Sequence, residues 1–227
     1  MKRIDVGVYS EMFAQNKTFD FVLVDDCSTD DTLQILDTFS SAENVSVLKL
    51  NKNLGKAEAI RFAVNSSNLN SYNYIGYLDA DLSTPINEME KLNDFIQSNT
   101  TLKFVMGARI KLIGNKVERS LTRHYFGRVF ATIASQFILK TPVYDTQCGA
   151  KIIDKDLAIK LFEAPFQTKW LFDLELLLRF KKLDNRFNTK VAEIPLFTWK
   201  EMPGSKIKLV DFIRIPFQLL KLFLKNA

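Results

Sequence analysis

Short apolar segments alternate with segments of helical periodicity through the first two-thirds of the sequence. The apolar segments are rich in residues that favour β-strands, and they cover residues 19–24, 45–50, 74–78 and 102–106. Apolar side chains three and four positions apart, typical of helices with one buried face, recur in residues 32–39, 57–64 and 85–96. Repeated strand–helix units predict an α/β, Rossmann-like fold, with a mainly parallel sheet covered by helices on both faces.

Aspartates follow two of these predicted strands. Asp25 and Asp26 end the first, in VLVDDCSTDDT, and Asp79 and Asp81 end the third, in YIGYLDADLSTP. The carboxyl ends of buried parallel strands meet at one edge of a sheet, so we expect these carboxylates to gather there. Because like charges repel, such a cluster needs a cation, a hydrogen-bonding ligand or open water.

The D-x-D pair allows two interpretations. Asp79 and Asp81 share one side of an extended backbone, because side chains alternate along a strand. Two hard carboxylate ligands could hold Mg²⁺ or Mn²⁺ and leave coordination positions for phosphate oxygens. The alternative is a solvated turn ahead of a helix that Ser83 or Thr84 caps and Pro85 begins.

Residues near the first two strands could bind a nucleotide. Asp25 and Asp26 could accept hydrogen bonds from a base imide or from ribose hydroxyls, or they could only cap the next helix. Gly55 and Lys56 begin a predicted helix in NKNLGKAEAI, where backbone N–H groups and a cation favour an anion. Gly55 could also serve only to permit a tight turn.

The composition is that of a globular protein with a basic C-terminal region. Of the 227 residues, 47% are hydrophobic and 25% charged, and the two cysteines favour reduced thiols in a cytosolic setting. The net charge is +5, and residues 200–227 hold six basic against two acidic residues. This excess favours an anionic partner. We expect this partner to be lipid headgroups rather than nucleic acid, because the region is too apolar to recognise nucleic-acid bases.

Three of these motifs occur in the order found in glycosyltransferase family 2, whose members have the GT-A fold: VLVDDCSTDDT, NLGKAEAI and YLDADLSTP. The resemblance extends over about residues 3 to 210, through MGARI, ERSLTRHYFGR, DTQCGAKI, WLFDLELLLRF and WKEMPGSK. This set resembles the dolichyl-phosphate glucosyltransferases and their bacterial polyprenyl-phosphate relatives. The resemblance implies a metal-dependent, inverting transfer of a sugar to a polyprenyl phosphate from a nucleotide-sugar donor, with UDP-glucose favoured.

The resemblance also implies roles for individual residues. Asp25 and Asp26 would face the base and ribose, Lys56 would lie near the nucleoside, and Asp79 and Asp81 would hold Mg²⁺ or Mn²⁺. The family's basic residues beside the phosphates correspond to Arg109, Arg119, Arg123 and Lys206. The stretches that resemble the sugar and acceptor region contain Asp145, Gln147, Asp173 and Glu175.

Asp173 and Glu175 cannot both face one cleft from a regular helix, because a step of two residues turns the side chain by about 200°. We expect Asp173 to lie in the site and to position the sugar or the acceptor, with Arg109 and Asp145 as the other catalytic residues. Glu175 is expected to be a supporting group or a salt-bridge partner. An acceptor phosphate is already largely ionised near neutral pH, so the reaction needs no obligatory general base.

Two segments could bring the protein to a lipid substrate. Apolar residues recur at helical spacing in residues 121–138, and residues 208–225 combine a broad apolar face with a basic strip. Such a helix can lie in the headgroup layer, although it could also pack on the core or at a dimer contact. We therefore expect a catalytic domain over residues 1–200 and a membrane-interface tail over 201–227. The protein would associate peripherally with the cytoplasmic face of a membrane, without a spanning helix.

One part of the family pattern is missing from this sequence. Relatives begin with an apolar strand that ends in a P-x-Y-N-E-E-like turn, whereas this sequence begins MKRIDVGVYSEMF, which resembles the helix after that turn. In a GT-A sheet that strand is central, so we expect its neighbours to lack ladder partners. The alternatives are an N-terminally truncated sequence, a rearranged pairing that closes the gap, or a catalytically inactive, membrane-associated scaffold.

A phospho-acceptor receiver domain is a further rival hypothesis. VLVDD resembles the acidic pair of such domains, and Asp79 could be the phosphorylated aspartate. Asp81, the arginine series and the C-terminal part of the chain would then have no role.

Overall fold

The computed structural model describes residues 4–118, 132–202, 217–219 and 222. Three of the predicted phosphate-binding residues lie outside this described part, namely Arg119, Arg123 and Lys206. Most of the two segments expected at a membrane also lie outside it.

The strands of the described part form three sheets. The largest has the order β3-β6-β4-β7, which are Tyr74–Leu78, Ala150–Asp154, Phe104–Ala108 and Val191–Pro195. A parallel pair contains β1 (Phe21–Asp25) and β2 (Val45–Lys49), and a small parallel pair contains β5 (Lys116–Glu118) and β8 (Thr198–Lys200).

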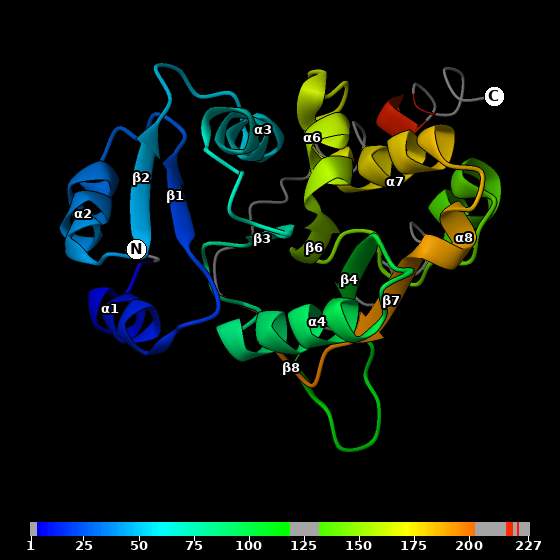
Figure 1. The fold of residues 1–227 in the computed structure, drawn as a ribbon, viewed down its shortest axis with the longest axis horizontal. Coiled ribbons are helices and arrows are strands. Elements are labelled where there is room, and N and C mark those ends of the chain that lie inside the picture. Colours follow the sequence, from blue (N-terminus) through cyan, green and yellow to red (C-terminus); the bar gives the residue numbers. More distant parts are fainter. Residues whose placement is uncertain (1–3, 119–131, 203–216, 220–221, 223–227) are drawn as a thin grey trace.

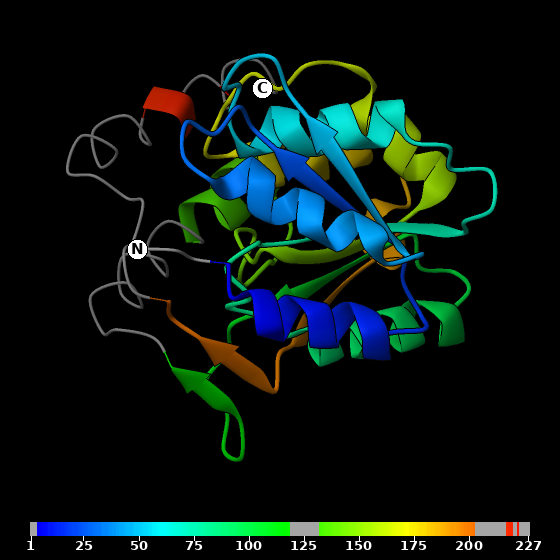
Figure 2. The same cartoon turned by 90° about the vertical axis from the view of Figure 1, so that its left-hand side faces the viewer.

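Helices cover the sheets on both faces (Figures 1 and 2). The largest apolar cluster joins β3, β4 and β6 to α3 (Lys56–Ser66), α6 (Lys155–Glu163) and α7 (Phe172–Leu183). On the other face, Met89, Leu92 and Ile96 of α4 (Ile86–Ser98) pack against the same sheet. A separate cluster joins β1 and β2 to α1 (Val6–Gln15), α2 (Thr32–Thr38) and the short 3-10 helix η1 (Phe39–Ser41). The remaining elements are η2 (Ala134–Leu139) and α8 (Phe187–Lys190).

The strands and helices predicted over residues 19–106 are all present, with one difference in strand direction. β1 pairs parallel with β2, and β4 pairs parallel with β7, as the strand–helix repeats predict. β6 instead runs antiparallel to both of its neighbours, β3 and β4. It was not among the strands that the sequence predicts, and it follows the helical segment η2 and a loop. The helix predicted over residues 85–96 begins one residue later and ends two residues later, at Ile86–Ser98, and its N-cap residue is Pro85 rather than Ser83 or Thr84.

The two larger sheets are not joined to each other. β1 pairs only with β2, and β3 pairs only with β6, in the part of the chain that the structure describes. The edges of β1 and β3 that lack a partner both border one cavity of about 2020 Å³, which we call the central cavity. The expectation that the neighbours of the missing strand lack ladder partners is therefore met, and no rearranged pairing closes the gap among the described residues.

Three residues of the expected membrane-interface tail can be placed near the core. Leu219 and Leu222 are buried in the largest apolar cluster, whereas Phe217 is 70% exposed. At the two leucines the structure agrees with the alternative that the tail packs on the core. Within the described ranges, no helix has both the length and the apolar character that crossing a membrane would require.

Candidate active site

The carboxyl end of β1 is held by hydrogen bonds from its own loop and from the start of α3. Asp25 is almost fully buried, and both of its carboxylate oxygens accept from the N–H of Ser28, at 3.2 and 3.3 Å. The carboxylate of Asp26 accepts from the N–H groups of Leu54 and Gly55, each at 2.8 Å. Neither aspartate caps the next helix, α2, whose N-cap residue is Asp31; their carboxylates instead fix the loop after β1 and the approach to α3. Both residues also border the central cavity, so a ligand could still reach them.

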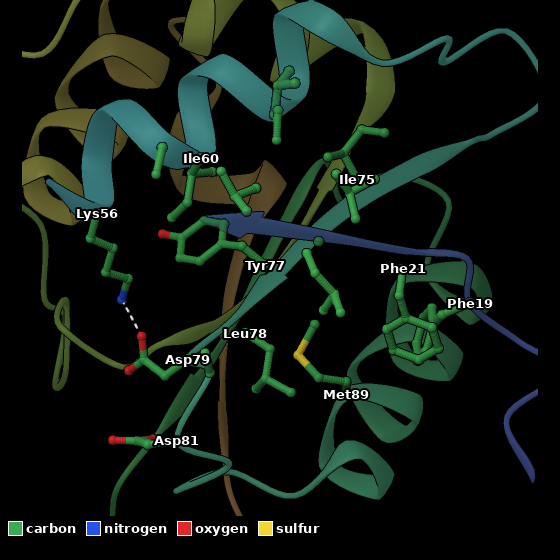
Figure 3. A pocket seen from close by; sticks show the side chains of 18 of the residues that line it. Phe19, Phe21, Lys56, Ile60, Ile75, Tyr77, Leu78, Asp79, Asp81 and Met89 are labelled. Atoms are coloured by element: carbon green, nitrogen blue, oxygen red, sulfur yellow. Dashed lines mark ion pairs between the residues drawn. The ribbon is translucent and has the colours of Figure 1, made fainter. Parts of the chain in front are cut away.

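The D-x-D pair lies in a turn that follows β3, rather than on extended backbone. The strand ends at Leu78, and Leu82, with a left-handed φ of 50°, donates its N–H to the carbonyl of Asp79. Figure 3 shows the carboxylates of Asp79 and Asp81 pointing to the same side of this turn. The N–H and the hydroxyl of Ser83 both donate to Oδ1 of Asp81, at 3.0 and 2.7 Å, which fixes the orientation of that carboxylate.

Lys56 connects the start of α3 to the end of β3. Its ammonium forms an ion pair with Oδ1 of Asp79 (Figure 3) and lies over the rings of Tyr77 and Phe172, at 5.7 and 5.3 Å from their centroids. Burial lowers the pKa of Lys56, but the nearby carboxylates of Asp79 and Asp173 outweigh this effect and raise it above the usual value. Lys56 therefore remains a cation beside the D-x-D turn.

Gly149 permits the close packing around Asp79. The N–H of Asp79 donates to the carbonyl of Gly149, at 3.1 Å. A Cβ atom at position 149 would collide with the carboxylate of Asp79. Glycine at this position is thus required by the close approach of the D-x-D turn to the loop before β6.

Arg109 and Asp145 form a two-bond ion pair at the cavity wall. Nε and Nη2 of Arg109 donate to the two carboxylate oxygens of Asp145, at 2.6 and 2.7 Å. The guanidinium also lies over the ring of Trp199, 5.4 Å from its centroid. Burial lowers the pKa of Arg109, but Asp145 outweighs this effect and raises it, so the guanidinium stays charged. Asp145 thereby fixes the direction of a cation that borders the cavity.

Asp173 is held by two residues that the sequence does not single out. Oδ1 of Asp173 accepts from Nζ of Lys151 at 2.6 Å and from the hydroxyl of Tyr77 at 2.5 Å. Lys151 has no exposed surface, and its ammonium also donates to the carbonyl of Cys148 at 2.5 Å. The one available signal in the sequence is a lysine inside the apolar run AKIID.

Asp173 and Glu175 face different surroundings, as helical geometry predicts. Asp173 borders the central cavity, and Glu175 does not. Glu175 instead pairs with Arg179 at 2.8 Å and accepts from the N–H of Gln167 at 3.0 Å. Of its two expected roles, Glu175 therefore has that of a salt-bridge partner.

The loop before β6 presents polar atoms without partners. Nε2 of Gln147 and Oγ1 of Thr146 are buried and form no hydrogen bond with any described residue. Both residues border the central cavity. A buried donor without a partner costs free energy, so these atoms would gain from a polar ligand or ordered water.

The central cavity brings together every predicted site residue in the described part of the chain. Its walls include Asp25, Asp26, Lys56, Asp79, Asp81, Arg109, Asp145, Gln147 and Asp173. The described residues contain no cluster of three or more His, Cys, Asp or Glu side chains that could hold a metal ion by themselves. No described residue bonds to Oδ2 of Asp79 or to Oδ2 of Asp81, so the pair provides two hard oxygen ligands of the kind that Mg²⁺ and Mn²⁺ take.

Comparison with known proteins agrees with this arrangement. The Glycosyl transferase family 2 profile matches residues 9–162. A dolichyl-phosphate beta-glucosyltransferase of Trichomonas vaginalis, ALG5C, is 32% identical over 213 residues, which are 90% of this chain and 60% of the relative. The dolichyl-phosphate beta-glucosyltransferase of Saccharomyces cerevisiae is 30% identical over 216 residues, covering 87% of this chain and 62% of the relative. The chain thus spans about three-fifths of the length of these relatives.

Solved structures show the same fold. Glucosyl-3-phosphoglycerate synthase from Mycobacterium tuberculosis in complex with UDP has a TM-score of 0.69 and 15% identity, over 97% of this chain and 74% of that one. The same enzyme with Mn²⁺, UDP and glucosyl-3-phosphoglycerate has a TM-score of 0.66 and 14% identity, over 97% of this chain and 74% of that one. The fold is therefore GT-A, and the profile match covers more than half of the sequence. This chain belongs to glycosyltransferase family 2.

Proposed function

We propose that this protein transfers glucose from UDP-glucose to dolichyl phosphate or another polyprenyl phosphate, with Mg²⁺ or Mn²⁺ as cofactor. The observation that carries the proposal is the convergence of acidic, basic and unpartnered polar groups on one cavity at the carboxyl ends of β1 and β3. The names of the relatives support the sugar and the acceptor. The structural neighbours solved with UDP and Mn²⁺ support the donor class and the metal.

The D-x-D turn would bind the donor's pyrophosphate. Asp79 and Asp81 would hold the divalent cation through their free Oδ2 atoms, and the bound cation would offset negative charge on the leaving nucleotide diphosphate. Lys56 adds a second cation at the same place, and Ser83 keeps the carboxylate of Asp81 oriented. Asp25 and Asp26 border the same cavity, where the base and ribose would lie.

The acceptor phosphate needs to be positioned, but it needs no general base, because it is already ionised. An oxygen of the acceptor phosphate forms a bond to the anomeric carbon, while the bond from that carbon to UDP breaks and its electron pair leaves with UDP. The configuration at the carbon is inverted. Asp173, fixed by Lys151 and Tyr77, and Gln147, with its unpartnered amide, would position the sugar and the acceptor. Arg109 would offset phosphate charge, and Arg119, Arg123 and Lys206 are proposed to do the same.

The protein would reach its lipid substrate from the cytoplasmic face of a membrane. The proposal rests on the apolar and basic pattern of residues 121–138 and 208–225 and on the membrane-bound acceptor named for its relatives. Most of both segments lies outside the described residues.

A transfer assay tests the proposal. The chain is incubated with radiolabelled UDP-glucose, Mn²⁺ and a polyprenyl phosphate in detergent, and labelled lipid is extracted. We expect labelled glucosyl lipid with the unaltered chain and with Asp37→Asn, an exposed aspartate that does not border the cavity. We expect none with Asp81→Asn. Equal product from both variants would refute the role of Asp81, and product without any divalent cation would refute the metal dependence.

The split between the sheets favours a second candidate function, an inactive scaffold of the same fold. β1 carries Asp25, and one edge of β1 has no partner among the described strands, so part of the nucleotide site rests on a two-stranded sheet. UDP binding without any glucosyl lipid product would support the scaffold. The receiver-domain hypothesis is set aside, because the chain belongs to glycosyltransferase family 2.

A further inference from the structure

The loop between β4 and β5 carries two exposed aliphatic side chains at its apex. Leu112 is 49% exposed, and Ile113 is fully exposed, at 107%. The loop projects away from the rest of the described chain in both Figure 1 and Figure 2. Gly, Pro, Asn, Asp and Ser are the usual residues of turns, so neither turn geometry nor core packing accounts for two aliphatic residues here.

Hydrogen bonds fix the conformation of this loop. The N–H of Asn115 donates to the carbonyl of Leu112 at 3.2 Å, and Gly114 has the left-handed φ of 90° that the third position of a type II turn requires. A Cβ atom at Gly114 would meet nothing within 4 Å, so the apex stands in open space. The side-chain amide of Asn115 also donates to the carbonyl of Leu196, at 2.9 Å. The turn therefore holds Ile113 away from the body of the protein.

Basic side chains flank the apex. Lys111 and Lys116 are both exposed, and residues 109–117 contain three basic residues and no acidic one. Phe197 adds a further apolar side chain, 47% exposed, at the base of the loop, where its carbonyl accepts from the N–H of Lys116 at 2.7 Å. An apolar tip with a cationic rim is complementary to a bilayer that contains anionic lipid, because aliphatic groups enter the acyl boundary while lysines stay at the phosphates.

The loop lies at the edge of the sheet that carries the candidate active site. It follows Arg109, which borders the central cavity, and the four residues from Arg109 to Ile113 span at most about 14 Å. On β8, the ring of Trp199 lies 5.4 Å from the guanidinium of Arg109, and Lys200 donates its N–H to the carbonyl of Ser83 at 2.9 Å. A surface that meets the apex of the loop is therefore close to the cavity.

The same two strands lead into both segments that the sequence analysis expects at a membrane. β5 ends at Glu118, shortly before residues 121–138, and β8 ends at Lys200, where the tail of residues 201–227 begins. A strand of three residues is about 10 Å long, so the loop at the start of β5 is close to the ends of both strands. This continuity, together with the charge of the loop, favours a lipid surface over a protein partner.

We propose that residues 111–116 form a membrane anchor, in which Leu112 and Ile113 insert into the interfacial layer of a bilayer that contains anionic lipid. Lys111 and Lys116 lie at the headgroups. This anchor acts in addition to the two segments named above, and it holds the central cavity next to the headgroup layer, where a polyprenyl phosphate presents its phosphate. The inference deepens the proposed function and rests on it for the lipid acceptor.

Quenching of tryptophan fluorescence by brominated lipid tests the proposal. The full chain with Ile113→Trp is mixed with vesicles of phosphatidylcholine and phosphatidylglycerol that carry bromine on their acyl chains. We expect quenching of the added fluorescence, after subtraction of the signal of the unaltered chain, which contains Trp170 and Trp199.

Leu183→Trp is the matched control for this measurement. Leu183 is a 55% exposed aliphatic residue at the end of α7, and the chain continues from there through α8 to the start of β7, at the opposite end of the sheet from the loop. We expect its fluorescence to be unaffected by the brominated lipid. No quenching at position 113, or equal quenching at both positions, would overturn the proposal.

Sedimentation with the same vesicles, without bromine, measures what the loop contributes to binding. We expect Ile113→Asp to lower the partition coefficient on the order of tenfold or more, because it removes an inserted aliphatic group and adds a charge of the same sign as the lipid. Leu183→Asp should leave the partition coefficient nearly unchanged. Because Ile113 is fully exposed, its replacement should not alter the unfolding midpoint, which separates lost binding from misfolding.

Undiminished sedimentation of Ile113→Asp would overturn the proposal. A dimer of the unaltered chain that Ile113→Asp dissociates would overturn the lipid partner in favour of a second copy of the chain. The vesicles contain neither polyprenyl phosphate nor UDP-glucose. A failure here would therefore leave the transfer reaction in detergent standing, and a failure of that reaction would leave the vesicle result standing.

Discussion

Lys151 and Asp173 form an ion pair in the interior, with 2.6 Å between Nζ and Oδ1 and no exposed surface on the lysine. The pair joins the second residue of β6 to the first turn of α7, and the hydroxyl of Tyr77 on β3 also donates to Asp173. An uncompensated charge in such surroundings is costly, so each partner requires the other. The arrangement holds Asp173 at the cavity wall, where we propose that it positions the substrates.

Replacing Lys151 with methionine should therefore destabilise the fold strongly. We expect Lys151→Met to lower the free energy of unfolding by about 3–5 kcal/mol, because it leaves the buried carboxylate of Asp173 without its cation. Urea denaturation followed by circular dichroism measures the change. Lys103→Met is the control, since Lys103 pairs with Asp154 while 40% exposed, and its loss should cost less than about 1 kcal/mol. Similar costs for the two variants would contradict this view of the pair.

Cys148 should make the protein less stable in alkaline solution. Burial, followed by the charge of Asp145, raises the pKa of Cys148 from 9.0 to about 11. The unfolded chain therefore ionises first as the pH rises. The stabilising contribution is complete below pH 9 and is lost between pH 9 and 11, by about 2–3 kcal/mol.

Urea midpoints measured across this pH range check the prediction. Cys148→Ala should reduce the alkaline loss of stability, and Cys27→Ala, at a partly exposed position, should leave it unchanged. An equally steep loss in Cys148→Ala would assign the effect to other groups.

Gly149→Ala should disturb the D-x-D turn without touching its carboxylates chemically. The added methyl group collides with the carboxylate of Asp79, so that side chain must leave its place beside Lys56. We expect UDP affinity in the presence of Mn²⁺ to fall on the order of tenfold or more. Gly7→Ala is the matched control, because its new methyl group lies 3.4 Å from the nearest side-chain atom, in an exposed part of α1. If both variants bind UDP as the unaltered chain does, Gly149 has no role in placing Asp79.

The sequence predicts that the site lies at one edge of the sheet, because it shows both where the strands end and where the aspartates stand. Asp25 and Asp79 each follow an apolar run, and parallel packing brings the ends of such runs to one edge. The hydrogen bonds of Asp26 to Leu54 and Gly55 could not be predicted, because they join segments 28 and 29 residues apart. The sequence left the capping and ligand roles of Asp26 open, and the structure shows Asp26 bonded to the loop ahead of α3, at the wall of a cavity.

Other features depend on tertiary contacts that no local pattern reports. The antiparallel direction of β6 relative to β3 and β4 is one of them, because strand direction is set by pairing between segments far apart in the sequence. Lys151 looks like an interruption of an apolar strand until Asp173 and Tyr77, 22 residues and 74 residues away in the sequence, are placed beside it. The unpaired edges of β1 and β3 were expected from the family resemblance alone.

Calorimetric titration with UDP, in the presence and absence of Mn²⁺, tests most directly the claim that the D-x-D carboxylates bind a nucleotide diphosphate through a cation. We predict one UDP site whose affinity requires Mn²⁺, that Asp37→Asn retains and that Asp81→Asn loses. UDP affinity that is the same with and without Mn²⁺, or that Asp81→Asn leaves unchanged, would contradict the account.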